Sequence, residues 1–189
     1  MNVGIMNVSY AERAWYQTSI LMLVVIPLVL VAMQLDDRTL NGISVWIKPL
    51  KFHISATLHV LTFAVLIGFL PTKTRSALWL TLLASVSVAA IIVEVIIIDF
   101  QAARGVPSHF NYNSHFDGML YATMGIAALL LSSPALVLGI RFMFADVSER
   151  LTPGLKLGAG LGLTFGFFLT LGIAGYLSMS KTGHWIGAP

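Results

Sequence analysis

The stretch that decides the fold is Ala89-Ala90-Ile91-Ile92-Val93-Glu94-Val95-Ile96-Ile97-Ile98, nine apolar residues around one carboxylate. It lies within an apolar run from about Ser76 to Arg104, which exceeds the roughly 20 residues that a helix needs to cross a bilayer. Because lipid offers no hydrogen bonds to the backbone, such a run is predicted to be a helix. Four similar runs occur at about 16–35, 52–70, 115–142 and 157–178. The sequence therefore predicts an all-α polytopic integral membrane bundle of five transmembrane helices, with residues 1–189 as a single membrane domain.

The composition of the 189 residues excludes several classes of protein. Apolar residues make up 57% and charged residues only 10%, against about 45–50% and about 25% in ordinary soluble domains. The net charge of +3 comes from only 11 basic and 8 acidic residues, too few for a surface that tracks phosphates. A soluble fold, a disordered tail and a nucleic-acid binder are therefore excluded. The chain has no cysteine, so any cofactor must be held by His, Asp, Glu, Met, Tyr or backbone atoms.

Glu94 is the sharpest single signal of a functional site. A charge near the centre of a bilayer costs at least about 2.5–3.5 kcal/mol, so this carboxylate must be paired, protonated or bound to a ligand. By helical geometry Gln101 lies on the same face as Glu94, whereas Asp99 is rotated away by about 140°. Two interpretations are open: a structural bond between helices, or proton transfer, substrate binding or metal ligation.

The second span begins with the segment Lys48-Pro49-Leu50-Lys51-Phe52-His53, followed by Ser55 and His59. Ser55 and His59 share a helix face, and His59 lies about 9 Å deeper than His53, at a depth comparable with that of Glu94. A histidine and a carboxylate at one depth can form a proton relay or half of a metal site. The alternatives are a neutral His59 bonded to a neighbouring helix and lysines that extend to the membrane interface.

The connection between the third and fourth spans, residues 101–115, is more specific in composition than a tether needs to be. Gly105 is suited to end the third helix, and Pro107 prevents its resumption. The connection contains two histidines, His109 and His115, with Asn111 between them. We expect these histidines to complete a site with three other residues of the same face, which are His53, Asp99 and Asp117.

The start of the fourth span also has a structural interpretation. Ser114-His115-Phe116-Asp117 fits the capping pattern of a helix N-terminus, in which Asp117 serves the helix and not a ligand. In that first turn the helix dipole disfavours a charged His115 and leaves a neutral imidazole free to ligate. Both roles of Asp117 remain open.

Three segments of the chain together resemble a set of short bacterial polytopic membrane proteins of unassigned function. The resemblance rests on Lys48-Pro49-x-Lys51-Phe52-x-x-Ser55, on Glu94, and on Gln101-x-x-Arg104-Gly105-x-x-Ser108-His109-Phe110-Asn111, about the middle third of the chain. It implies no activity, but it suggests that these polar residues act as one group. We accordingly expect the bacterial inner membrane as the location.

Charge distribution gives the orientation only weakly. Six of the 11 Lys and Arg residues fall on the face of the N-terminus and five on the other face. Because Lys48, Lys51 and Arg104 belong to the motifs above, they need not act as topology signals. We expect a cytoplasmic N-terminus, which places the polar motifs toward the outer face.

The first functional hypothesis is an integral membrane metalloprotein, an oxidoreductase or a metal-dependent enzyme, with its site near the outer face. Its cofactor would be b-type haem or a divalent transition metal, since such ions accept histidine and carboxylate ligands. The candidate metal ligands are His53, His59, His109, His115, Glu94 and Asp117. The candidate catalytic residues are Glu94, Asp99 and His109. The residues predicted to bind a substrate or the haem propionates are Lys48, Lys51, Ser55, Gln101, Arg104, Ser108 and Asn111.

Two other hypotheses stay open. A proton-coupled transporter of a small molecule or ion would use Glu94 as the titrating group, and a non-catalytic assembly subunit would need the polar residues only for structure. The expected partners are the lipid bilayer and a small molecule, ion or quinone-like ligand, with no nucleic acid. The fifth span also carries a small-residue face that lets another helix approach closely, inside the bundle or in a homo-oligomer; it consists of Gly158, Gly162 and Gly166.

Overall fold

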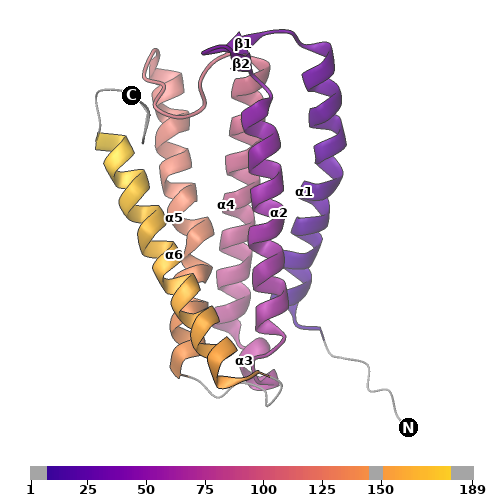
Figure 1. Cartoon of the computed structure of the whole chain (residues 1–189), viewed down its shortest axis with the longest axis vertical. Helices are drawn as coiled ribbons and strands as arrows, with labels where there is room; N and C mark the ends of the chain where they lie inside the picture. Colours follow the sequence, from indigo (N-terminus) through magenta and orange to yellow (C-terminus); the bar gives the residue numbers. More distant parts are fainter. Residues whose placement is uncertain (1–7, 145–150, 180–189) are drawn as a thin grey trace.

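The computed structural model describes residues 8–144 and 151–179, and these ranges contain five long helices (Figure 1). All five are long and apolar enough to cross a membrane. The prediction of an all-α five-helix bundle is therefore confirmed, and the chain is an integral membrane protein. The five helices are α1 (Tyr10–Leu35), α2 (Ile47–Ile67), α4 (Leu78–Ala103), α5 (His115–Phe144) and α6 (Pro153–Met179).

Capping explains where two of the helices begin. α1 begins at Tyr10 and not at residue 16 because Ser9 and Glu12 form a capping box: the Glu12 N–H donates to the Ser9 hydroxyl at 3.3 Å, and the Ser9 N–H donates to the Glu12 carboxylate at 2.8 Å. α6 begins at Pro153, a favoured first position for proline. The preceding Thr152 hydroxyl accepts from the Leu155 N–H at 3.3 Å.

α2 also differs from its predicted limits, beginning at Ile47 and not near residue 52, and ending at Ile67 and not near residue 70. Lys48 and Pro49 therefore lie inside the first turn of the helix. Proline is tolerated there because the first N–H groups of a helix have no partner within it. Lys48 is consequently held on a rigid element and not on a loop.

Three short elements that were not predicted lie at the two ends of the bundle (Figure 1). At one end, β1 (Thr39–Leu40) pairs antiparallel with β2 (Ile43–Ser44). The turn residues Asn41 and Gly42 have φ values of 54° and 80°, as an Asn-Gly hairpin turn requires. At the other end lies α3 (Thr72–Arg75). We refer to the two ends as the hairpin end and the α3 end.

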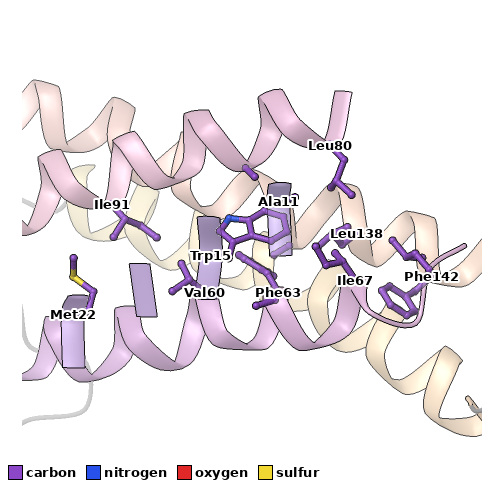
Figure 2. Close-up of a cluster of buried hydrophobic side chains, with 14 of the residues drawn as sticks. Ala11, Trp15, Met22, Val60, Phe63, Ile67, Leu80, Ile91, Leu138 and Phe142 are labelled. Carbon is purple, nitrogen blue, oxygen red and sulfur yellow. The ribbon is translucent and has the colours of Figure 1, made fainter. Parts of the chain in front are cut away.

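The largest apolar cluster lies toward the α3 end of the bundle, where α1 and α4 begin and α2 and α5 finish (Figure 2). Trp15 is fully buried, its ring centroid lies 5.3 Å from that of Phe63, and its Nε1–H donates to the Ser87 hydroxyl at 2.9 Å. Leu138 and Phe142 of α5 extend the cluster. Close packing of this kind holds helices together in lipid, where water expulsion contributes little.

α5 and α6 pack on different glycines from those that the sequence singled out. A Cβ atom on Gly160 would lie 2.6 Å from the Cγ of Met143, and one on Gly139 would lie 2.9 Å from the carbonyl oxygen of Gly160. The close approach of the two helices therefore needs both residues to be glycine. The predicted small-residue face does not pack against the other helices that the structure describes, because none of their atoms lies within 4 Å of a Cβ placed on Gly158, Gly162 or Gly166.

Candidate functional site

A cavity of about 370 Å³ lies among α2, α4, α5 and α6. Most of its wall is apolar, with Phe52, Ile91 and Leu131 among the larger side chains. A mainly apolar cavity into which a few polar groups converge is the usual form of a small-molecule site. We call it the Glu94 cavity, and its polar wall residues are Ser55, His59, Glu94, His109, Ser132 and Thr170.

Glu94 lies in the wall of this cavity with unused hydrogen-bonding capacity. Its side chain comes from the middle of α4 and the residue is only 4% exposed. The carboxyl oxygen Oε2 is buried and has no hydrogen-bond partner within the described residues. An unsatisfied buried oxygen is costly. Within the described residues, Oε2 of Glu94 therefore makes no bond to another helix.

His59 occupies the same cavity wall and is bonded to a neighbouring helix. Its Nε2 lies 3.3 Å from the carbonyl oxygen of Leu131 in α5, to which it can donate, and its ring stands edge-on to Phe63 at 4.5 Å. A donor role fits a neutral or a charged imidazole. His59 is thus bonded to a neighbouring helix, as the structural alternative expected, and also lines the same cavity as Glu94.

Lys48 and His109 form a direct contact at the hairpin side of the cavity. The Lys48 ammonium group can donate to Nδ1 of His109 at 2.9 Å, and the Ser108 hydroxyl lies 3.3 Å from the same nitrogen. Lys48 and Glu94 form no ion pair in the part of the chain that the structure describes. The Lys48–His109 contact was not predicted, because it joins a helix to a loop 61 residues further along the chain.

A second polar group, which we call the Asp117 cluster, is bonded within itself. Asp117 Oδ1 accepts from Nε2 of Gln101 at 2.9 Å and from Nη1 of Arg104 at 2.7 Å. Asp117 Oδ2 accepts from the Ser114 hydroxyl at 2.6 Å, and the Asp117 N–H donates back to that hydroxyl at 3.1 Å. Ser114 therefore caps the start of α5 by accepting from the Asp117 N–H, and both carboxylate oxygens of Asp117 accept hydrogen bonds.

Arg104 is held on its remaining sides by aromatic rings. Its guanidinium carbon lies 5.5 Å from the ring centroid of Phe100 and 5.4 Å from that of Phe116. Such cation–π contacts add to the ion pair with Asp117. Gly105 follows with a φ of 71°, the left-handed conformation that ends a helix. These contacts fasten the end of α4 to the start of α5.

The other predicted residues are spread over separate places. His53 is 2% exposed and its Nε2 lies 3.0 Å from Oδ2 of Asp99, outside the wall of the Glu94 cavity. Asn111 shapes its own loop, since Nδ2 donates to the Pro107 carbonyl at 3.1 Å. Lys51 and His115 are exposed.

This arrangement bears on the expected metal site. Within residues 8–144 and 151–179, no three His, Asp or Glu side chains lie close enough together to hold a metal ion. His53 is engaged with Asp99, and Asp117 with Arg104. His59, His109 and Glu94 are the candidate ligands that share one cavity. The metal centre and the b-type haem stay predictions.

Two hydroxyl residues of the cavity wall, Ser132 and Thr170, were missed by the sequence analysis. They lie on α5 and α6, and the Ser132 hydroxyl donates to the Ala128 carbonyl of its own helix at 2.7 Å. The available signal was an isolated hydroxyl within an apolar span. That signal is weak, because such groups often bond only to their own helix.

Comparison with known proteins places the chain in no family: no family model, no curated protein and no solved structure matches it. The resemblance to short bacterial membrane proteins therefore stays a prediction. The class of integral membrane protein follows from the five spans, and any function has to be argued from the site itself.

Proposed function

We propose that the chain binds a small, mostly apolar molecule with a hydrogen-bonding group, such as a quinone-like compound, and that Glu94 exchanges a proton in the process. Proton-coupled transport is the function that this site supports best. The observation that carries the proposal is the buried carboxyl oxygen of Glu94, which has no hydrogen-bond partner within the described residues and lies in the wall of a cavity.

The chemistry of the cavity wall defines the ligand. Phe52, Ile91 and Leu131 offer apolar contact, whereas Ser55 and Glu94 offer hydrogen bonds. A fully charged ligand would lose its hydration without enough partners to replace it. A compound with apolar rings or chains and one or two polar atoms fits both parts of the wall.

The position of the cavity supports entry from the bilayer. Thr170 and Ala174 of α6 complete its wall. Of the five spans, α6 has the smallest share of buried residues. α6 packs mainly on α5 and crosses the bundle at an angle (Figure 1). A ligand that dissolves in lipid can therefore reach the cavity along the exposed side of α6.

Binding and proton exchange are linked at this carboxyl group. A ligand that donates a hydrogen bond to Glu94 stabilises the carboxylate, and one that accepts a hydrogen bond stabilises the protonated acid. Either ligand changes the number of protons bound by the protein.

Decylubiquinone is a suitable first probe. We expect the purified protein in weakly buffered detergent to take up or release about one proton per quinone bound, measured with a pH indicator. Glu94→Gln should still fold and bind but should lose the proton signal. Asp99→Asn is the matched control, because Asp99 is on the same helix and outside the cavity wall. A proton signal that survives in Glu94→Gln, or no binding by the wild-type protein, would contradict the proposal.

Membrane redox or metal-assisted chemistry is a second candidate. The observation in its favour is that His59 and His109 line the same cavity as Glu94, and a b-type haem needs only two axial ligands. A Soret band that shifts on reduction with dithionite and disappears in His109→Ala would support this candidate. A colourless, folded preparation without stoichiometric metal would favour proton-coupled transport.

The proposal extends to location and assembly. We place the protein in the bacterial inner membrane with a cytoplasmic N-terminus, so that the hairpin end faces outward. The face of α6 that holds Gly158, Gly162 and Gly166 is our proposed contact with a second copy. A purely structural role as an assembly subunit has the least support, because it gives the Glu94 cavity no purpose.

A further inference from the structure

A second cavity, of about 420 Å³, lies at the hairpin end. It is bounded by the hairpin, by the start of α2 and by the loop that follows α4. Two residues, Phe52 and His109, belong to the walls of both this cavity and the Glu94 cavity. The two spaces are therefore neighbours, and these two side chains lie at their boundary.

The second cavity has the character of an aqueous entrance. Asn41 and Ile43 of its wall are exposed at the surface. Ser44, Lys48 and Ser108 add polar groups further in. Water occupies spaces of this size when several hydrogen-bonding partners surround it. Lys48 is thus placed between the water-accessible side and the boundary.

At the boundary, His109 has the contacts that a proton-transfer residue needs. Its Nδ1 lies 2.9 Å from the Lys48 ammonium group, on the entrance side. The rings of Phe52 and Tyr121 lie 5.9 Å and 6.1 Å from its ring, centroid to centroid. An imidazole can accept a proton at one nitrogen while it releases another proton from the other nitrogen.

We propose that Lys48 and His109 form the route by which protons pass between the hairpin-end cavity and Glu94. This proposal rests on the proposed function, in which Glu94 exchanges a proton. In the inward direction, the Lys48 ammonium group gives a proton to Nδ1 of His109, and His109 gives its Nε2 proton through cavity water to the Glu94 carboxylate. Lys48 then regains a proton from water in the hairpin-end cavity, and a return of His109 to its first tautomer completes the transfer of one proton.

The charged and titratable groups around this route come from three helices. Lys48 and His59 belong to α2, Glu94 to α4 and Tyr121 to α5. The Arg104–Asp117 ion pair is separate from the route, because neither residue lines either cavity. Within the described residues, Lys48 and Ser108 both lie against Nδ1 of His109 and line the hairpin-end cavity, and Lys48 is the charged one of the two.

Infrared hydrogen–deuterium exchange tests the route without any ligand. In acidic buffer a protonated Glu94 has a carbonyl band, which Glu94→Gln identifies by its absence. After transfer to D₂O the shift of this band reports how fast protons reach Glu94. We expect His109→Phe and Lys48→Met each to slow the shift by at least about tenfold. The matched controls are His115→Phe and Lys51→Met, which change exposed residues at the start of α5 and in α2 and should leave the rate unchanged.

Each outcome separates the route from the proposed function. If no Glu94 band appears at any pH, Glu94 does not hold a proton, and both the proposed function and the route are wrong. If the band appears but shifts as fast in His109→Phe and Lys48→Met as in the wild type, protons reach Glu94 elsewhere and only the route is overturned. Circular dichroism of every variant establishes that the helices are intact.

Discussion

Glu94 and Asp117 are two buried carboxylates of one bundle with opposite surroundings. Their exposures are nearly equal, at 4% and 5%. Asp117 accepts hydrogen bonds from Ser114, Gln101 and Arg104. Glu94 has a buried oxygen without a partner in the described part of the chain and lies beside a cavity. The two acids therefore share their degree of burial and differ in how many hydrogen bonds they accept.

The difference has an energetic meaning. A carboxylate whose oxygens are all bonded stabilises the fold, and removal of that carboxylate leaves its partners unsatisfied. A carboxylate without partners weakens the fold, so its presence in a packed bundle needs another reason. For Glu94 the adjacent cavity provides that reason.

Substitution of the two acids should show the largest effect. Asp117→Asn leaves Arg104 without its counter-charge, so we expect a large decrease in Tm and a loss of folded protein on purification. Glu94→Gln removes a buried carboxylate that has few partners, so we expect an unchanged or higher Tm together with the loss of proton exchange. Thermal unfolding followed by circular dichroism measures both. A larger decrease in Tm for Glu94→Gln than for Asp117→Asn would contradict the distinction between an acid with all its hydrogen bonds and one without.

A substitution at the crossing of α5 and α6 should affect the cavity and spare the Asp117 cluster. In Gly139→Ala the new Cβ atom would lie 2.9 Å from the Gly160 carbonyl oxygen. We expect a loss of roughly 1–3 kcal/mol in the free energy of unfolding. Quinone binding should also weaken, because α6 carries Thr170 and Ala174 of the cavity wall. Denaturant titration and binding measurements on one preparation test both effects.

Gly162→Ala is the matched control for Gly139→Ala. No atom lies within 4 Å of a Cβ placed on Gly162, so we expect little change in the stability of the single chain. A larger loss in Gly162→Ala than in Gly139→Ala would contradict the packing described here. A loss of dimers in Gly162→Ala, with the single chain unaffected, would support the proposed contact between copies.

The smallest effect is expected at Asp36, an acid whose carboxylate is bonded to an exposed arginine. Its carboxylate accepts from Nε and Nη2 of Arg38 at 2.8 Å and 2.7 Å and from Nε1 of Trp46 at 2.8 Å. The bonds from Arg38 and then from Trp46 hold the pKa of Asp36 well below 3.8. Because the Arg38 side chain is 53% exposed, solvent screens much of this interaction.

The sign of the pH dependence at Asp36 follows from the lowered pKa. The stabilisation is complete above the unfolded value of 3.8 and is lost as the pH falls below that value toward the folded pKa. We expect the difference in Tm between the wild type and Asp36→Asn to be small and constant near neutral pH and to shrink in acid. A difference that grows as the pH falls would contradict the assignment.

The spans were predictable from the sequence, and their ends were less so. Apolar runs longer than a bilayer crossing require helices whatever their neighbours are. The start of α1 depends instead on the Ser9–Glu12 capping box, and the Asn41–Gly42 turn forms a hairpin that the apolar runs do not indicate. Both signals are local and present in the sequence, but hydropathy alone does not contain them.

The candidate site was predictable only as a set of residues at one end of the bundle. Helical periodicity placed Glu94 and His59 at comparable depth, and both line one cavity. Periodicity also placed Gln101 on the face of Glu94, but the Gln101 side chain bonds to Asp117. Periodicity specifies a face and a depth and does not specify the partner on another helix.

The amino-acid sequence by itself determined the class of the protein. In lipid, only helices and closed β-barrels satisfy every backbone hydrogen bond, and the five long apolar runs predict helices. It also marked Glu94, since the cost of a charge in lipid depends little on the rest of the fold. The tertiary structure alone decided which polar residues bond to one another. Asp117 is saturated and Glu94 is not because of contacts between helices and loops far apart in the chain, and such contacts depend on how the helices pack.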